Sequence, residues 1–170
     1  VGGAAFMHAG AYDGQFSDVL VSTTHVTRSG KTDSLLGPEM EMDYRKSAYQ
    51  ENGCIVTSVV VRLEPGSQEQ ISMQMDEYFN RRKARQPLEM PSAGSVFKRP
   101  EGMYAGTLIE EAGLKGTQIG GAMVSEKHAG FIVNTGNATC EDVLKLIDKI
   151  RDTVKKKSGV TLECEIRPVS

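Results

Sequence analysis

Four polar side chains in this 170-residue sequence are of types that can do acid–base or anion-binding chemistry: Arg45, Ser95, His128 and Glu165. An arginine offers a planar, permanently charged fork to a carboxylate or phosphate. A serine or histidine can donate a proton, but a lone one is more often structural. Glu165 next to Arg167 is, taken alone, typical of a weak surface ion pair. Only a combination of such residues would therefore indicate a functional site.

Composition and charge narrow the class of protein. Hydrophobic residues make up 39% and the formal net charge is -2, which favours a packed core and gives no basic surface for nucleic acid. The three cysteines, Cys54, Cys140 and Cys164, are odd in number and far apart, so we expect no disulfide framework or metal site. No run approaches the ~20 apolar residues of a membrane helix, and the first residues lack the charged start and apolar middle of a signal peptide. We expect a cytoplasmic protein without membrane insertion.

The elements that must position these residues predict an α+β fold. Runs rich in β-branched residues predict strands at 18–28, 54–63, 129–134 and 160–169. In the last run, Glu165 and Arg167 fall on the polar side of the alternation. The strands do not alternate strictly with helices, so we expect a mixed or antiparallel sheet with helices packed on it.

Helical periodicity and capping residues predict the helices. They are expected at 68–85 after the N-cap Ser67, with Gln70 as capping-box partner, at 104–112, and at 140–157 after the N-cap Thr139. Glycine-rich segments predict loops at 2–14, 92–102 and 113–121, and segment 39–49 is compatible with a loop or a short helix.

Short strings in a fixed order carry more information than any single residue. They are YR-x-S at 44–47, RR-x-x-x-QP at 81–87, PSAGSVFK at 91–98, LKG and IGGA at 114–122, VS-x-KHAGFIVN at 124–134 and LE-x-EIR at 162–167. Together with the opening GGAAFMHAGAY, they resemble the UDP-N-acetylenolpyruvoylglucosamine reductase family over essentially all 170 residues. The 50 positions between Arg45 and Ser95 leave no room for an inserted subdomain, so the resemblance is to the shorter subclass.

This resemblance implies a domain organisation. Residues 1–65 would be the end of a vanillyl-alcohol-oxidase-like FAD-binding domain, and residues 66–170 would be the C-terminal substrate-binding domain. Because the chain opens on Val1-Gly2-Gly3 without an initiator methionine, we interpret it as a C-terminal fragment. Most of the FAD-binding surface would precede Val1, so we expect the 170 residues alone to be inactive and not to retain FAD.

The resemblance also implies a reaction and its residues. NADPH would reduce FAD, and hydride would then pass to the vinyl carbon of UDP-N-acetylglucosamine enolpyruvate, giving UDP-N-acetylmuramate for peptidoglycan. Arg45, Ser95 and Glu165 fall at the catalytic positions. An arginine and a protonated carboxyl group would stabilise the charge that develops on the substrate carboxylate, and Ser95 would deliver the proton. Tyr44 and Arg82 are the candidates for substrate binding.

Candidates for contact with the flavin lie in the opening segment. They are Gly2, Gly3, Gly10 and Ala11, where the backbone could approach the cofactor closely. His8 stands where the family usually has asparagine, and Asp13 stands where glycine is common. Two alternatives remain open: a non-catalytic nucleotide-sugar binding module on the same scaffold, and a different flavin oxidoreductase of the same superfamily.

Overall fold

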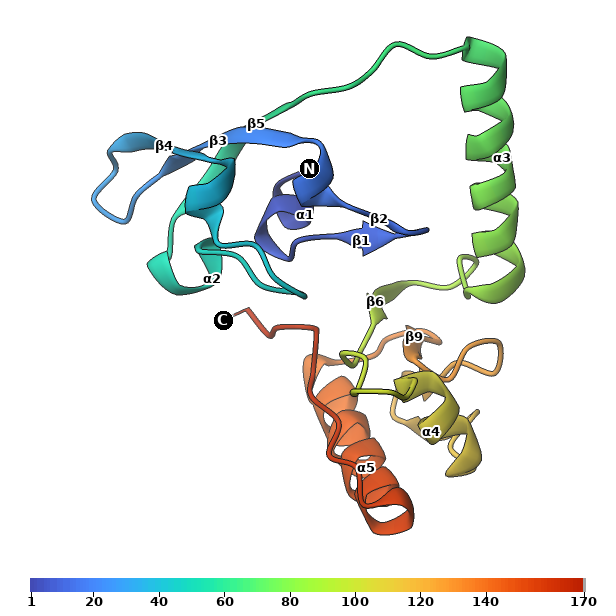
Figure 1. Ribbon diagram of the computed structural model, residues 1–170. Coiled ribbons are helices and arrows are strands. Elements are labelled where there is room, and N and C mark those ends of the chain that lie inside the picture. The colour runs from blue at the N-terminus through green and yellow to red at the C-terminus, as the bar shows by residue number, and fades with distance from the viewer. Residues whose placement is uncertain (170) are drawn as a thin grey trace. The chain divides into compact units, whose positions relative to one another are not determined.

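The computed structural model describes residues 1–169, which divide into two compact units at Gly66–Ser67 (Figure 1). Every strand pair in both units is antiparallel. The predicted α+β class with antiparallel sheets is therefore confirmed. No helix within residues 1–169 is long and apolar enough to cross a membrane.

The first unit is built on a three-stranded sheet with the order β4-β3-β5. The strands are β3 (Leu20–Val26), β4 (Thr32–Leu36) and β5 (Ile55–Val61). Two of them confirm the strands expected at 18–28 and 54–63. Strand β4 was not predicted because its residues TDSLL do not alternate in polarity and are mostly exposed. The core is small, with Leu20, Met40 and Tyr49 buried at its centre.

Short elements surround this sheet. They are α1 (Gly2–Phe6), the hairpin β1 (Gly10–Ala11) and β2 (Gly14–Gln15), the 3-10 turns η1 (Phe16–Asp18) and η2 (Gly37–Met40), and α2 (Tyr49–Asn52). The segment predicted as a glycine-rich opening loop therefore contains a helical turn, which packs against β5, and a hairpin. The segment 39–49, which was compatible with a loop or a short helix, combines the end of η2, a turn and the start of α2.

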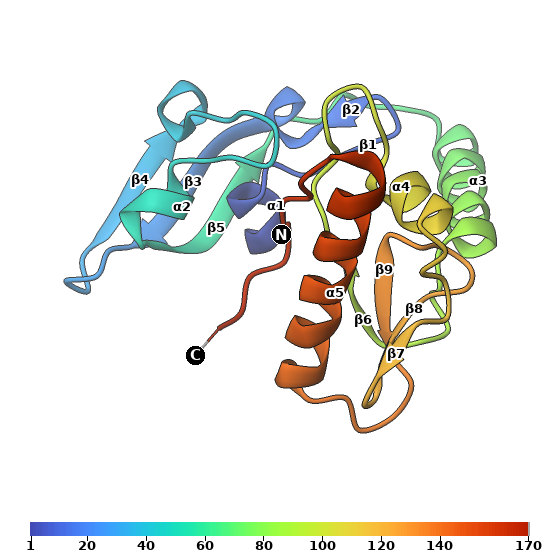
Figure 2. The same cartoon turned by 90° about the horizontal axis from the view of Figure 1, so that it is seen from below.

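The second unit has a four-stranded sheet with the order β6-β9-β8-β7. Its strands are β6 (Ser92–Ser95), β7 (Gln118–Ile119), β8 (Ala122–Val124) and β9 (Phe131–Asn134). Helices α4 (Ala105–Glu111) and α5 (Cys140–Ser158) share one buried core with this sheet (Figure 2). Segments 92–102 and 113–121 were predicted as loops, and each in fact contains a short strand.

Helix α5 follows its sequence pattern closely. The Thr139 hydroxyl accepts a hydrogen bond from the backbone N–H of Asp142, as expected of an N-cap, and the helix ends at Gly159 in the left-handed conformation. Leu146, Ile147 and Ile150 are buried against the sheet together with Val154. Burial of apolar surface is worth about 25 cal/mol per Å², so this face stabilises the unit.

The strand expected at 160–169 is wrong as a regular element. A single bridge joins Cys164 to Phe97, flanked by hydrogen bonds from Lys98 N–H to Glu163 O and from Glu165 N–H to Val96 O. Pro100 and Pro168 lie on either side of this pair and have no N–H with which to extend it.

Helix α3 (Gln68–Arg85) has the expected bounds, but its environment differs from the prediction. Ser67 is the N-cap residue, yet its side chain forms no capping hydrogen bond, so the expected capping box with Gln70 is wrong. Among the described residues, none in α3 is buried, and Ile71, Met75 and Phe79 are each about half exposed or more. The helix lies beyond α4 as seen from α5 in both views (Figures 1 and 2).

Candidate functional site

Ser95 and Glu165, 70 positions apart in the sequence, are brought together by backbone pairing in the second unit. Ser95 ends β6 and pairs with Phe131 of β9. The next residue, Val96, donates its N–H to Gly130 O at 2.9 Å and accepts the Glu165 N–H at 2.8 Å. The two side chains are therefore anchored on adjacent backbone segments, one residue apart across the bridge.

The environments of the two side chains differ. Ser95 is exposed and Glu165 is half-buried, while Val96 between them belongs to the core. Within residues 1–169, the Ser95 hydroxyl makes no hydrogen bond to the protein. A cavity of about 400 Å³ lies nearby, with Val96, Ile132, Val143 and Ile166 in its wall. Neither Ser95 nor Glu165 lines this cavity, so the predicted catalytic pair does not belong to it.

Arg45 belongs to the first unit, where it sits in a tight turn. Asp43 and Lys46 close the turn through backbone hydrogen bonds of 2.9 and 3.2 Å. Arg45 itself has φ +52°, the left-handed region that costs a non-glycine residue about 1–2 kcal/mol. The guanidinium carbon lies 5.3 Å from the centre of the Tyr44 ring, within cation–π range. Tyr44, which is exposed, and Arg45, which is half-buried, thus form one aromatic–cation pair.

Side chains from outside the turn hold it in this conformation. Gln50 Nε2 donates to Arg45 O at 2.8 Å and lies 3.2 Å from Phe6 O, and Ser47 Oγ donates to Phe6 O at 2.7 Å. The His8 ring nitrogen Nδ1 lies 2.8 Å from Asp43 O. Since Ser47 is fully buried, these contacts fix the Arg45 turn to the end of α1.

The glycine candidates differ from their prediction in conformation. Gly2 and Gly3 belong to α1 and Gly10 and Ala11 to β1, and none of the three glycines has a positive φ. A side chain at Gly3 would meet no atom within 4 Å, so its backbone is open to a close approach. The left-handed residues of the opening segment are instead His8, Tyr12 and Asp13.

His8 and Asp13 have φ values of +44° and +63°. Glycine, asparagine, aspartate and histidine tolerate this region better than other residues do. His8 is buried, and its second ring nitrogen lies 3.0 Å from Ser17 Oγ. Its imidazole therefore has a structural role in the first unit.

Arg82 lies in the last turn of α3 with Lys83 and Arg85, directly after Arg81, and all four are exposed. Arg81 lies 3.6 Å from Glu77 one turn earlier. The expected basic end of α3 is therefore present on the surface of the second unit, although its role in substrate binding stays a prediction.

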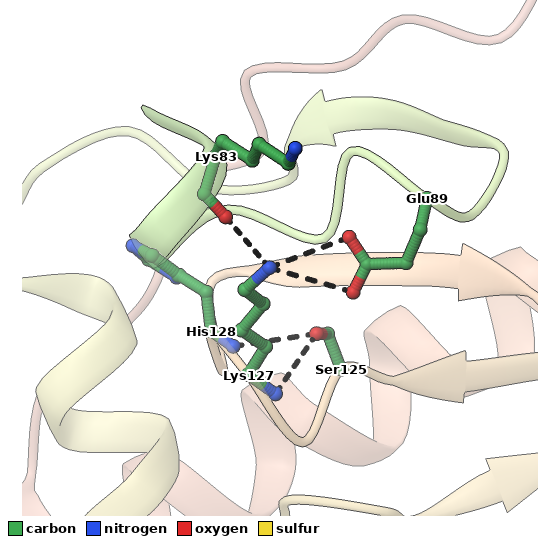
Figure 3. Close-up of polar contacts among 5 residues, drawn as sticks. All are labelled: Lys83, Glu89, Ser125, Lys127 and His128. Atoms are coloured by element: carbon green, nitrogen blue, oxygen red, sulfur yellow. Dashed lines mark hydrogen bonds and ion pairs between the residues drawn. The ribbon is translucent and has the colours of Figure 1, made fainter. Parts of the chain in front are cut away.

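The turn between β8 and β9 holds two further polar residues of the second unit. Burial is the main cause that lowers the pKa of His128, and its Nδ1 accepts the Gly130 N–H at 3.0 Å. Lys127 Nζ donates to Lys83 O at 2.7 Å and lies 3.4 Å from the Glu89 carboxylate (Figure 3). Neither Lys127 nor Gln50 was predicted from the sequence, although Lys127 stands within the string VS-x-KHAGFIVN.

Comparisons with known proteins agree with this fold. The fold is shared with the crystal structure of UDP-N-acetylenolpyruvylglucosamine reductase from Thermus caldophilus. That structure superposes with a TM-score of 0.83 at 38% identity, over 98% of this chain and 59% of that one. Residues 86–169 match the family model for the C-terminal domain of UDP-N-acetylenolpyruvoylglucosamine reductase.

Curated relatives extend the likeness to nearly the whole chain. The reductase of Lachnoclostridium phytofermentans is 52% identical and that of Shouchella clausii 51%, each over 98% of this chain. The chain spans about half the length of these relatives, 54% and 53% respectively. It belongs to the UDP-N-acetylenolpyruvoylglucosamine reductase family.

Proposed function

We propose that this chain forms part of an FAD-dependent oxidoreductase that reduces UDP-N-acetylglucosamine enolpyruvate to UDP-N-acetylmuramate with NADPH, in peptidoglycan precursor synthesis. The observation that carries the proposal is the pairing of Glu165 N–H with Val96 O, which sets a carboxyl group beside the strand of an exposed serine. Because the chain spans half of its relatives, the activity is proposed for a polypeptide of their full length.

The first unit fits a role as the end of an FAD-binding domain. The backbone of Gly3 is exposed and unobstructed, which is what contact with a large planar cofactor requires. When bound, FAD would supply the hydride that NADPH provides. The candidate contacts are Gly2, Gly3, Gly10 and Ala11, and the second unit, from Ser67 onward, would bind the UDP-sugar.

Arg45 and Glu165 would act on the carboxylate of the enolpyruvyl group. Addition of hydride to the vinyl carbon pushes negative charge toward that carboxylate, and fixed donors lower the energy of this state. The guanidinium of Arg45 supplies such a charge on a turn whose backbone is held by Gln50. Glu165, half-buried, would hydrogen-bond the same group when protonated.

Ser95 would deliver the proton to the α-carbon. A hydroxyl is a weak acid, so this step needs a strongly basic intermediate and close contact. The Ser95 hydroxyl makes no hydrogen bond within residues 1–169, which leaves it available to a substrate. Tyr44 and Arg82 would help to hold the substrate, with Arg82 directed to its diphosphate.

The lack of a hydrogen-bond partner for the Ser95 hydroxyl within residues 1–169 also favours a second candidate, a non-catalytic nucleotide-sugar binding module. Within the described part of the second unit, no basic side chain hydrogen-bonds the Ser95 hydroxyl. A module that only binds would retain affinity for the UDP-sugar without any need for a proton donor.

Substitutions of two serines in β6 would distinguish the reductase from the binding module. Ser95→Ala and Ser92→Ala would each be introduced into a polypeptide of the relatives' length, and substrate-dependent NADPH oxidation would be assayed beside calorimetric binding of the UDP-sugar. The reductase proposal expects Ser95→Ala to lose turnover while still binding substrate, and Ser92→Ala to remain active. Binding without any NADPH oxidation in the unaltered protein would support the module instead.

A further inference from the structure

Few contacts fix the position of helix α3 in the second unit. None of its residues is buried in the described chain, so apolar packing contributes little to its placement. Its C-terminal end nevertheless carries Arg82, the proposed contact for the substrate's diphosphate. Polar contacts at this end must therefore determine where the basic side chains lie.

Lys127 provides such a contact (Figure 3). Its ammonium group donates to the backbone carbonyl of Lys83, in the last turn of α3, at 2.7 Å. The same group lies 3.4 Å from the carboxylate of Glu89, in the segment that follows the helix. A charged donor to a carbonyl at a helix C-terminus is favourable both as a hydrogen bond and through the helix dipole. One side chain thus holds the end of α3 and the segment leading to β6.

The backbone of Lys127 is itself fixed. The hydroxyl of Ser125, which is buried, accepts the N–H groups of Lys127 at 3.2 Å and His128 at 3.3 Å. The same turn continues to Gly130 and Phe131, which pair with Val96 and Ser95. The lysine therefore projects from the turn that borders the proposed proton donor.

We propose that Lys127 is a positioning residue, which sets the separation between the basic end of α3 and Ser95. This inference rests on the proposed function, because one UDP-sugar must place its diphosphate at Arg82 and its enolpyruvyl group at Ser95. A shift of the end of α3 would leave the Ser95 hydroxyl in place but would move the Arg82 guanidinium away from the diphosphate. Loss of Lys127 should therefore weaken substrate binding more than it slows the chemical step.

The test compares Lys127→Met with Lys127→Arg and with the control Lys115→Met. Lys115 has a similar exposure and a carboxylate partner, Glu110, at 2.7 Å, but does not contact α3. Hydrogen–deuterium exchange at residues 80–85 reports on the helix end, and steady-state kinetics in a polypeptide of the relatives' length report on the substrate.

The proposal expects faster exchange at 80–85 in Lys127→Met alone, with recovery in Lys127→Arg. It also expects KM for the UDP-sugar to rise about tenfold, equivalent to ~1.4 kcal/mol, with kcat changed less than about twofold. Faster exchange without a change in KM, a fall in kcat at unchanged KM, or an equal effect of Lys115→Met would overturn it. If the unaltered protein has no reductase activity, the proposed function fails and the role toward substrate fails with it. The exchange data would then still decide whether Lys127 holds α3.

Discussion

The two units fix their proposed catalytic residues by different means. In the first, Arg45 occupies an unfavourable backbone conformation that side-chain hydrogen bonds from Gln50 and its neighbours maintain beside a small core. In the second, Ser95 and Glu165 are held by backbone pairing at the edge of a large core. Polar substitutions should therefore disturb the first site, whereas the placement of Ser95 and Glu165 should be more sensitive to changes in the core of their unit.

The largest effect on stability is expected from the core of the second unit. Leu146→Ala empties a site with no exposed surface in α5, which should lower the free energy of unfolding by about 2–5 kcal/mol. Denaturant-induced unfolding measures the change. The control is Leu144→Ala in the same helix, where the side chain is 39% exposed, and it should have a small effect. An equal loss of stability in both variants would contradict the described packing.

The buried hydroxyl of Tyr49 gives the next largest effect. Its oxygen lies 2.5 Å from Thr23 Oγ1 and 3.1 Å from His25 Nδ1. Tyr49→Phe therefore removes a hydrogen bond from each of these two buried side chains. We expect the first unit to lose about 1–3 kcal/mol in thermal or denaturant unfolding. Tyr104→Phe, at an exposed position, is the matched control.

The pH dependence of the same residue sharpens this prediction. Burial is the main cause that raises the pKa of Tyr49 in the folded state. Below the unfolded-state pKa of about 10, both states keep the proton and the stability contribution is intact. Above it the unfolded state ionises first, so stability should fall as the pH rises through the folded-state pKa. Tyr49→Phe should lack this decline, and an identical decline in both proteins would assign it to other groups.

Gln50 tests the polar support of Arg45 directly. Gln50→Ala removes the donor to Arg45 O and Phe6 O, which should free the turn to relax from its left-handed conformation. We expect kcat/KM of the reductase to fall about tenfold, a loss of ~1.4 kcal/mol in transition-state stabilisation. Gln74→Ala, which removes only an exposed contact to Tyr78, should leave the rate unchanged. Equal rates for the two variants would show that the turn does not depend on Gln50.

The smallest effect concerns the start of α5. Thr139→Ala removes the hydroxyl that accepts the Asp142 N–H at 3.1 Å, which should cost about 1 kcal/mol of unfolding free energy. Thr153→Ala in the same helix removes a hydroxyl bonded to the preceding turn and should be neutral or slightly stabilising. A larger loss from Thr153→Ala would reverse the expected ranking.

The sequence predicted the elements whose patterns are strong and local. Helix α5 has both a cap and a periodic apolar face, and β3 and β5 are rich in β-branched residues. It failed where tertiary pairing decides the structure: Ser92–Ser95 contains small residues typical of a loop, and it is a strand because β9 supplies its partner. The run at 160–169 has the alternation of a strand, but its pairing stops after one bridge.

The candidate site was predictable in part for the same reason. The strings around residues 45, 95 and 165 indicated the family and the residue types, but not the contacts that support them. Gln50 and Lys127 act through backbone carbonyls of Arg45 and Lys83, and no spacing rule in the sequence identifies such backbone acceptors.

The most direct test of the account is a single-turnover measurement on Ser95→Ala in a polypeptide of the relatives' length. The enzyme would be reduced with NADPH beforehand and mixed with saturating UDP-N-acetylglucosamine enolpyruvate, and UDP-N-acetylmuramate formation would be followed by rapid quench. The account predicts normal reduction by NADPH and product formation slowed about 10²–10⁴-fold, the range expected for loss of a general acid. Product formation at the unaltered rate would contradict the assignment of Ser95 and, with it, the proposed role of the Ser95–Glu165 pair.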